Sequence, residues 1–150
     1  MTKLNDKHRE KIEDGGWAHA TIAIEVQGND EEYAKEALNK MIERMVQEKG
    51  IQIVDKEFSD IEKGENDLFS YSCEIEFIAR DFGKLTRVAL MYSPSFFEIH
   101  TPKKLSIEVG EAQNLLADIS HVVTSLSHAV FIQRGKLKQL GAEDDFKGQN

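Results

Sequence analysis

Residues 18–53 read AHATIAIEVQGNDEEYAKEALNKMIERMVQEKGIQI, and the hydrophobic period changes twice within them. From Ala18 to Val26 every second residue is apolar, which is the pattern of a half-buried strand. From Tyr33 to Val46 apolar residues recur in pairs at each turn, which predicts an amphipathic helix. Gly50 ends this helix, and an extended pattern resumes directly after it. The stretch therefore predicts a strand–helix–strand unit.

A second unit of the same kind follows. The strand predicted for residues 51–58 is succeeded by the alternating stretch FSYSCEIEFIA at residues 69–79. Asp81 then begins a short helix that ends before Pro94, and residues 96–100 form a fourth strand. A long helix runs from about residue 111 to residue 134. Because β-α-β crossovers are right-handed, this order predicts an α+β fold: a ferredoxin-like antiparallel sheet, strand order 4-1-3-2, plus a long C-terminal helix.

The two ends of the chain differ from this body in composition. Residues 1–16 are dense in charge and end in two glycines, which predicts a flexible arm. Residues 135–150 contain the acidic run 143–145 and predict a flexible tail. The intervening residues 17–134 form the single α+β domain.

The net charge is −8 at pH 7, with a pI of about 5.1. Such a potential disfavours non-specific binding to nucleic acid and to anionic membrane surfaces. The least polar stretch, residues 112–133, still contains Asp118, two histidines and several hydroxyls, so we expect no membrane span. Cys73 is the only cysteine, and the N-terminal residues lack the apolar core of a signal peptide. These features indicate a reducing, cytoplasmic compartment.

The first candidate site lies on the predicted open face of the sheet. If Ile22 and Ile24 face the crossover helices, the opposite face is polar. It presents these residues of three neighbouring strands: His19, Thr21, Glu25, Glu74, Glu76, Glu98 and His100. Strand one is antiparallel to both neighbours, so His19 is expected beside Glu76 and His100.

Two imidazoles and a carboxylate bind a divalent metal or act as acid and base. His19, Glu76 and His100 are therefore the candidate catalytic residues, and Glu25, Glu74 and Glu98 are candidate binding residues. The alternative is that these outward positions are polar because they face water. No cofactor is identified by any motif, and whether a metal binds stays open.

The second candidate is the C-terminal helix, in which Asp118 is the only charge between residues 112 and 133. Behind its apolar stripe lie small polar residues that include His121, Ser125 and His128. This composition predicts a helix packed on two sides. The second side is covered either by the chain's own sheet or by a symmetry-related helix, in which case these three residues are interface residues.

Two smaller signals concern individual residues. Cys73 is on the inward side of its strand and is expected to be an inert core thiol. Gly83 and Lys84 stand near a helix start without the rest of a Walker pattern, so they define no nucleotide site.

About a quarter of the chain resembles an ACT regulatory domain. The resemblance rests on the strand 22–26, the turn Gly28-Asn29-Asp30, the amphipathic helix and the closing sequence Gly50-Ile51-Gln52-Ile53. The Pro-Gly that is usual at the ACT turn is absent. The resemblance implies small-molecule binding at a dimer interface.

Two functions are therefore compatible with the sequence. The leading hypothesis is a non-enzymatic binding or interaction module, a homodimer or higher oligomer formed through the C-terminal helix or the open sheet face, with a small molecule as a possible ligand. The alternative is a small enzyme or metal-binding protein that uses the histidine and glutamate residues of the open sheet face.

Overall fold

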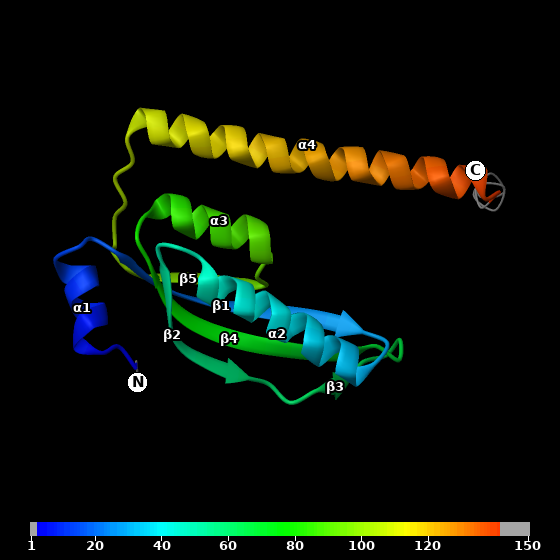
Figure 1. Cartoon of the computed structure of the whole chain (residues 1–150), viewed down its shortest axis with the longest axis horizontal. Helices are drawn as coiled ribbons and strands as arrows, with labels where there is room; N and C mark the ends of the chain where they lie inside the picture. Colours follow the sequence, from blue (N-terminus) through cyan, green and yellow to red (C-terminus); the bar gives the residue numbers. More distant parts are fainter. Residues whose placement is uncertain (1–2, 142–150) are drawn as a thin grey trace. The chain divides into compact units, whose positions relative to one another are not determined.

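The computed structural model describes residues 3–141, in which one antiparallel sheet of five strands carries helices on one face (Figure 1). The chain divides into two compact units, residues 1–107 and 108–150, and the sheet belongs wholly to the first. The strands in spatial order are β2 (Ile51–Phe58), β4 (Phe69–Ala79), β1 (Ala18–Gly28) and β5 (Phe96–Thr101), with β3 (Glu62–Lys63) paired to β4.

The α+β class, the antiparallel sheet and the long C-terminal helix are confirmed. Strand β3 was missed, because its two residues fall within a run that is rich in charge and glycine and has no alternating pattern. The sheet of five strands is thus not the strict four-stranded sheet that the sequence predicted.

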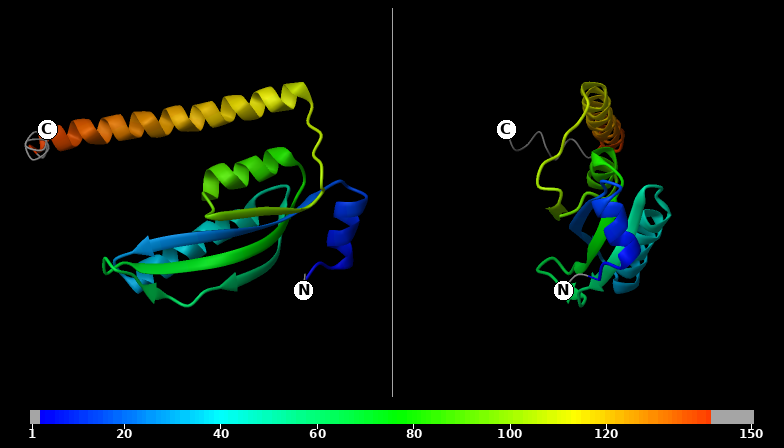
Figure 2. Two further views of the ribbon diagram at one scale, coloured as in Figure 1. Left: turned by 180° about the vertical axis from the view of Figure 1, so that it is seen from behind. Right: turned by 90° about the vertical axis from the view of Figure 1, so that its left-hand side faces the viewer.

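Helices α2 (Glu31–Gln47) and α3 (Phe82–Tyr92) lie on the same face of the sheet (Figure 2). Both begin at an aspartate whose carboxylate accepts a hydrogen bond from a backbone N–H of the first turn: Asp30 from Glu32 and Asp81 from Lys84, each at 2.9 Å. The short polar turns before these helices thereby fix where each crossover starts.

The core lies between these helices and the sheet. Alternate residues of β1, among them Ile22 and Ile24, are buried together with Ile75 and Phe77 of β4 and Leu38 of α2. Burying each of these side chains stabilises the fold by about 1.5–3 kcal/mol, so this layer fixes which sheet face meets the helices. The opposite face carries mainly polar residues, but Ile78 of β4, which pairs with His19, also lies on it and is fully buried.

The segment predicted as a flexible arm contains helix α1 (Asp6–Glu13), which Asn5 caps. The Nζ atom of Lys3 lies 3.0 Å from a carboxylate oxygen of Asp55 on β2. The ammonium group of Lys11 lies 4.5 Å from the centroid of the Trp17 ring. These contacts join the N-terminal segment to β2 and to Trp17 within the first unit.

Helix α4 (Val109–Gln139) is the main element of the second unit. It has 31 residues, none of which is buried. It continues beyond Arg134, so the tail predicted to begin at residue 135 starts inside the helix. Residues 142–150 of that predicted tail lie outside the described residues.

Candidate functional site

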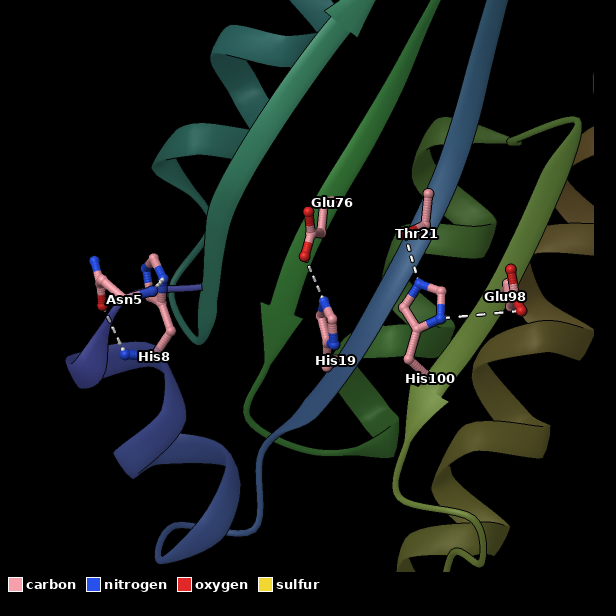
Figure 3. A network of polar contacts seen from close by, with 7 residues as sticks. All are labelled: Asn5, His8, His19, Thr21, Glu76, Glu98 and His100. Atoms are coloured by element: carbon pink, nitrogen blue, oxygen red, sulfur yellow. Dashed lines mark hydrogen bonds and ion pairs between the residues drawn. The ribbon is translucent and has the colours of Figure 1, made fainter. Parts of the chain in front are cut away.

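The open face of the sheet brings together several of the predicted site residues near the start of β1 (Figure 3). The register of β1 and β5 shifts between His19 and Ala20: His19 is opposite Thr101, whereas Ala20 is opposite Ile99. His100 is therefore an extra residue in a β-bulge, a feature that re-aims side chains at sheet edges. It places the His100 ring beside His19, with 4.8 Å between the ring centroids.

His19 forms the first of two polar contacts, which are equally short. Its Nε2 atom lies 2.7 Å from Oε1 of Glu76 on β4, and the two side chains are only 10% and 17% exposed. Because an ionised carboxylate only accepts hydrogen bonds, the Nε2–H group of His19 donates this hydrogen bond to Glu76. The carboxylate thus fixes both the orientation of the ring and the nitrogen that holds the proton.

The second contact joins β1 to β5. The Thr21 hydroxyl lies 2.7 Å from Nε2 of His100, and Nδ1 of the same ring lies 3.9 Å from Oε1 of Glu98. A hydroxyl, an imidazole and a carboxylate in this order are the elements of a nucleophile activated by a base. However, 3.9 Å is too long for a hydrogen bond, and Thr21 is only 9% exposed. The geometry therefore fits a structural contact between Thr21 and His100 and does not fit a role of Thr21 as a nucleophile.

The remaining predicted binding residues lie away from the imidazoles. Glu25 is exposed and accepts a hydrogen bond from Gln27. Glu25 is six residues after His19 on β1, so the two residues are about 20 Å apart along the strand. Glu74 is exposed and is opposite Ala23 of β1. It lies on the same face of β4 as Glu76, two residues away from it. Among the described residues, no group of three or more histidine, cysteine, aspartate or glutamate side chains is placed to hold a metal ion.

Cys73 is buried in the core cluster, where burial raises the pKa of its thiol from 9.0 to about 11. Its Sγ atom lies 3.5 Å from the carbonyl oxygen of Glu74. A thiol in this environment is almost entirely protonated at neutral pH and is a poor nucleophile. Cys73 therefore belongs to the core and not to a reactive site.

The three predicted interface residues lie on α4, and His121, Ser125 and His128 are all exposed. The same helix carries a feature that the predicted helix, which ended at residue 134, did not include. Apolar residues recur at alternate spacings of three and four residues along most of α4: Val109, Ala112, Leu116, Ile119, Val123, Leu126 and Val130, then, after the polar Gln133, Leu137 and the C-cap residue Leu140. A helical repeat of this period could have been found by counting heptads through residue 140.

By length and composition alone, α4 is also apolar enough to cross a membrane, with a mean hydropathy of 1.5 and none of the tested window buried. The core helix of a soluble protein passes the same test, but such a helix is mostly buried. The expectation of no membrane span therefore stays a prediction.

These features define a small α+β protein with a polar open sheet face and a long exposed apolar helix. The chain belongs to the MJ0538 family, whose model matches residues 19–143. The match covers residues of both the sheet and α4. No curated protein matches the chain, and no solved structure does.

Proposed function

We propose that this chain is a non-enzymatic interaction module that self-associates through α4, and that its partner is a second copy of the same helix. The observation that carries the proposal is the heptad spacing of apolar residues along a helix that buries none of its residues. Leu116 and Leu126 are 64% and 63% exposed. Covering such side chains contributes about 1.5–3 kcal/mol each, so an uncovered row of them favours association.

The seven-residue period of the apolar row indicates that another helix packs against it. A straight α-helix has 3.6 residues per turn, whereas a repeat of seven residues keeps one seam facing a neighbouring helix. Leu115 and Val122, beside the seam, widen the apolar stripe, as in helices of a bundle. Ser120 and Ser127, on its other edge, are small and allow helix axes to approach closely.

The charges of α4 favour an antiparallel pair. The acidic residues lie towards its N-terminal end and the basic residues towards its C-terminal end: Glu108, Glu111 and Asp118, then Arg134, Lys136 and Lys138. An antiparallel partner places opposite charges and opposite helix dipoles side by side, whereas a parallel partner places like charges together. If Val123 faces Leu126 of the second copy, Val130 faces Ile119 and Leu116 faces Gln133.

The opposite side of the helix distinguishes this partner from a lipid bilayer. It carries a continuous polar strip: Asn114, Asp118, His121, Ser125 and His128. A membrane span contacts hydrocarbon on all sides, and a charge at its centre is costly. This polar strip supports a protein partner and a cytoplasmic location, although Phe131 and Ile132, outside the seam, are also exposed apolar residues. In an oligomer larger than a dimer, His121, Ser125 and His128 are the residues available for a second interface.

The test is the oligomeric state by size-exclusion chromatography with light scattering. The wild-type chain is expected to elute as a dimer or larger oligomer, and Leu126→Glu, which places a charge in the seam, is expected to elute as a monomer. Asn114→Glu, on the polar strip, is the matched control and should leave the oligomer intact. A monomeric wild-type chain, or binding of α4 to phosphatidylcholine vesicles in place of self-association, contradicts the proposal.

The orientation is tested separately by disulfide cross-linking. Chains carrying Leu116→Cys and chains carrying Gln133→Cys are mixed and oxidised. An antiparallel pair gives the mixed cross-link between the two substitutions, whereas a parallel pair gives Leu116→Cys homodimers. The buried Cys73 does not compete in either case.

We further propose that the sheet is ferredoxin-like, with β3 as an addition to it. The order β2-β4-β1-β5 of its long strands and the placement of α2 and α3 on one face support this assignment. The ferredoxin-like class is compatible with many functions and does not itself decide between them.

A second candidate function is a small enzyme or metal-binding protein that uses the open sheet face. It is favoured by the two hydrogen-bonded imidazoles whose ring centroids lie 4.8 Å apart. Metal analysis of the purified protein tests its metal-binding form. Stoichiometric metal that is lost in both His19→Gln and His100→Gln supports the candidate. A wild-type chain without metal, also after incubation with zinc, contradicts it.

A further inference from the structure

A cavity of about 630 Å³ lies between the C-terminal turns of α2 and helix α3. This volume is in the range of small-molecule sites, about 300–1,000 Å³. Figure 1 shows the two helices beside each other on the same face of the sheet. All the residues that line the cavity belong to the first unit, residues 1–107.

The charges that line the cavity are the reverse of those of the whole chain. Four cationic side chains line it, Arg44, Lys49, Lys84 and Arg87, against a single carboxylate, Glu48. The net charge of the chain is −8. A concave surface whose sign opposes that of the molecule concentrates anions locally.

The one carboxylate is already engaged. Glu48 accepts a hydrogen bond from Nε of Arg87 at 2.9 Å and one from the Tyr92 hydroxyl at 3.4 Å. The Arg87 hydrogen bond holds the pKa of Glu48 below its ordinary value. Within residues 3–141, no ion pair engages Arg44, Lys49 or Lys84. Three cationic groups from two helices and the turn after α2 thus remain for an anion.

The turn after α2 also positions one of these cations. Gly50 has a φ of +81°, and a Cβ atom there would lie 3.0 Å from Cε of Lys84. A side chain at residue 50 would therefore meet the Lys84 stem where that stem crosses the turn. The glycine leaves Lys84 room to lie half-buried at the edge of the cavity.

The rest of the lining is apolar except for Gln47. Met41, Met91 and Tyr92 contribute to the wall, and Met91 is 52% exposed. Methionine side chains adapt to different shapes and contact planar groups favourably. The cavity therefore combines cationic groups with a soft apolar surface, which suits a molecule that is anionic at one end and apolar or planar at the other.

We propose that the cavity between α2 and α3 binds a small phosphorylated molecule, its phosphate groups held by Arg44, Lys49 and Lys84 and its remaining part lying against Met41 and Met91. Arginine and lysine are the side chains that recognise phosphate oxygens, as forked donors and as point charges. The negative field of the rest of the molecule disfavours a long polyanion such as RNA.

Isothermal titration calorimetry at about 0.15 M salt tests this proposal, with ADP and inorganic pyrophosphate as probes. ADP is expected to bind more tightly than pyrophosphate, because it also offers a planar group to the apolar wall. Arg44→Gln and Lys84→Gln are each expected to weaken ADP binding about tenfold, the loss that follows from one missing charge-assisted hydrogen bond. Lys40→Gln is the matched control, because Lys40 is on the same helix but pairs with Glu36 outside the cavity.

Three results overturn the proposal: no binding of either probe at millimolar concentration, equal binding by Arg44→Gln and Lys40→Gln, or equal displacement of ADP by sulfate. Tighter binding of a single-stranded RNA than of ADP, lost in the same variants, also overturns it in favour of a nucleic-acid site. Thermal melts establish that each variant is folded. Arg44 is exposed, so its substitution keeps the test valid if Lys84→Gln is unstable.

Discussion

The imidazole rings of His19 and His100 lie 4.8 Å apart and are tilted by 49°, and each is hydrogen-bonded to a different partner across the sheet. The two residues are 81 positions apart in the chain and meet because β1 lies between β4 and β5. His19 is held by Glu76 and His100 by Thr21, so the pair links three strands on the open face.

His19→Ala is expected to destabilise the protein by about 1–3 kcal/mol, because it removes the partner of a half-buried carboxylate, Glu76, and leaves a gap. His19→Gln retains a donor and should lose less. Urea unfolding measures both. His121→Ala on exposed α4 is the control, expected within about 0.5 kcal/mol of wild type. Equal stability of His19→Ala and wild type would show that the contact contributes nothing.

Helix α3 is expected to depend on its N-cap. Asp81→Ala removes the acceptor that bonds the backbone N–H of Lys84 at 2.9 Å, with an expected loss of about 1 kcal/mol. Asp81→Ser preserves an acceptor and should recover most of that loss. Thermal or urea unfolding of the two variants distinguishes them, and identical curves for serine and alanine would contradict the capping role.

Cys73 is expected to resist alkylation in the folded protein. With a pKa of about 11, its thiolate fraction at pH 8 is about a hundredfold smaller than that of a thiol with the ordinary value of 9.0, and the side chain is fully buried. Mass spectrometry after iodoacetamide treatment should show labelling in denaturant only. Ser125→Cys, on exposed α4, should label rapidly under native conditions. Native labelling of Cys73 at the denatured rate would be incompatible with its burial.

The Glu48–Arg87 pair is expected to make stability depend on pH on the acid side. The pKa of Glu48 is lowered from its ordinary 4.5, first by its hydrogen bond to Arg87. A carboxyl group with a lowered pKa in the folded state stabilises the protein above its unfolded pKa, and this contribution is lost as pH falls through the folded pKa. Because Arg87 is half-exposed, the contribution is about 1 kcal/mol or less.

Glu48→Gln should therefore be less stable than wild type at pH 7, and the difference should shrink below about pH 4. Denaturant unfolding across this pH range measures it. Glu36→Gln, which breaks an exposed pair on the same helix, should show a smaller dependence. A difference that is constant with pH would exclude an ionic origin.

Local patterns in the sequence determined most of the elements. The alternation from Phe69 to Ala79 and the spacing from Tyr33 to Val46 have periods that only a strand and a helix satisfy, so β4 and α2 could be predicted with close boundaries. Asp30 and Asp81 marked the helix starts for the same local reason, since a short acceptor side chain satisfies free backbone N–H groups. The heptad spacing of α4 is also wholly in the sequence.

Other features depended on the tertiary structure. The bulge that turns His100 towards His19 arises from the register between two strands, which no local pattern encodes. The cavity of Arg44, Lys49 and Lys84 exists because packing on the sheet brings α2 and α3 together, so that charges dispersed in an acidic sequence become one cationic surface. The spacing of apolar residues can be read from residues that are close in the sequence. A site, in contrast, is formed by residues that are distant in the sequence and come together only when the chain folds.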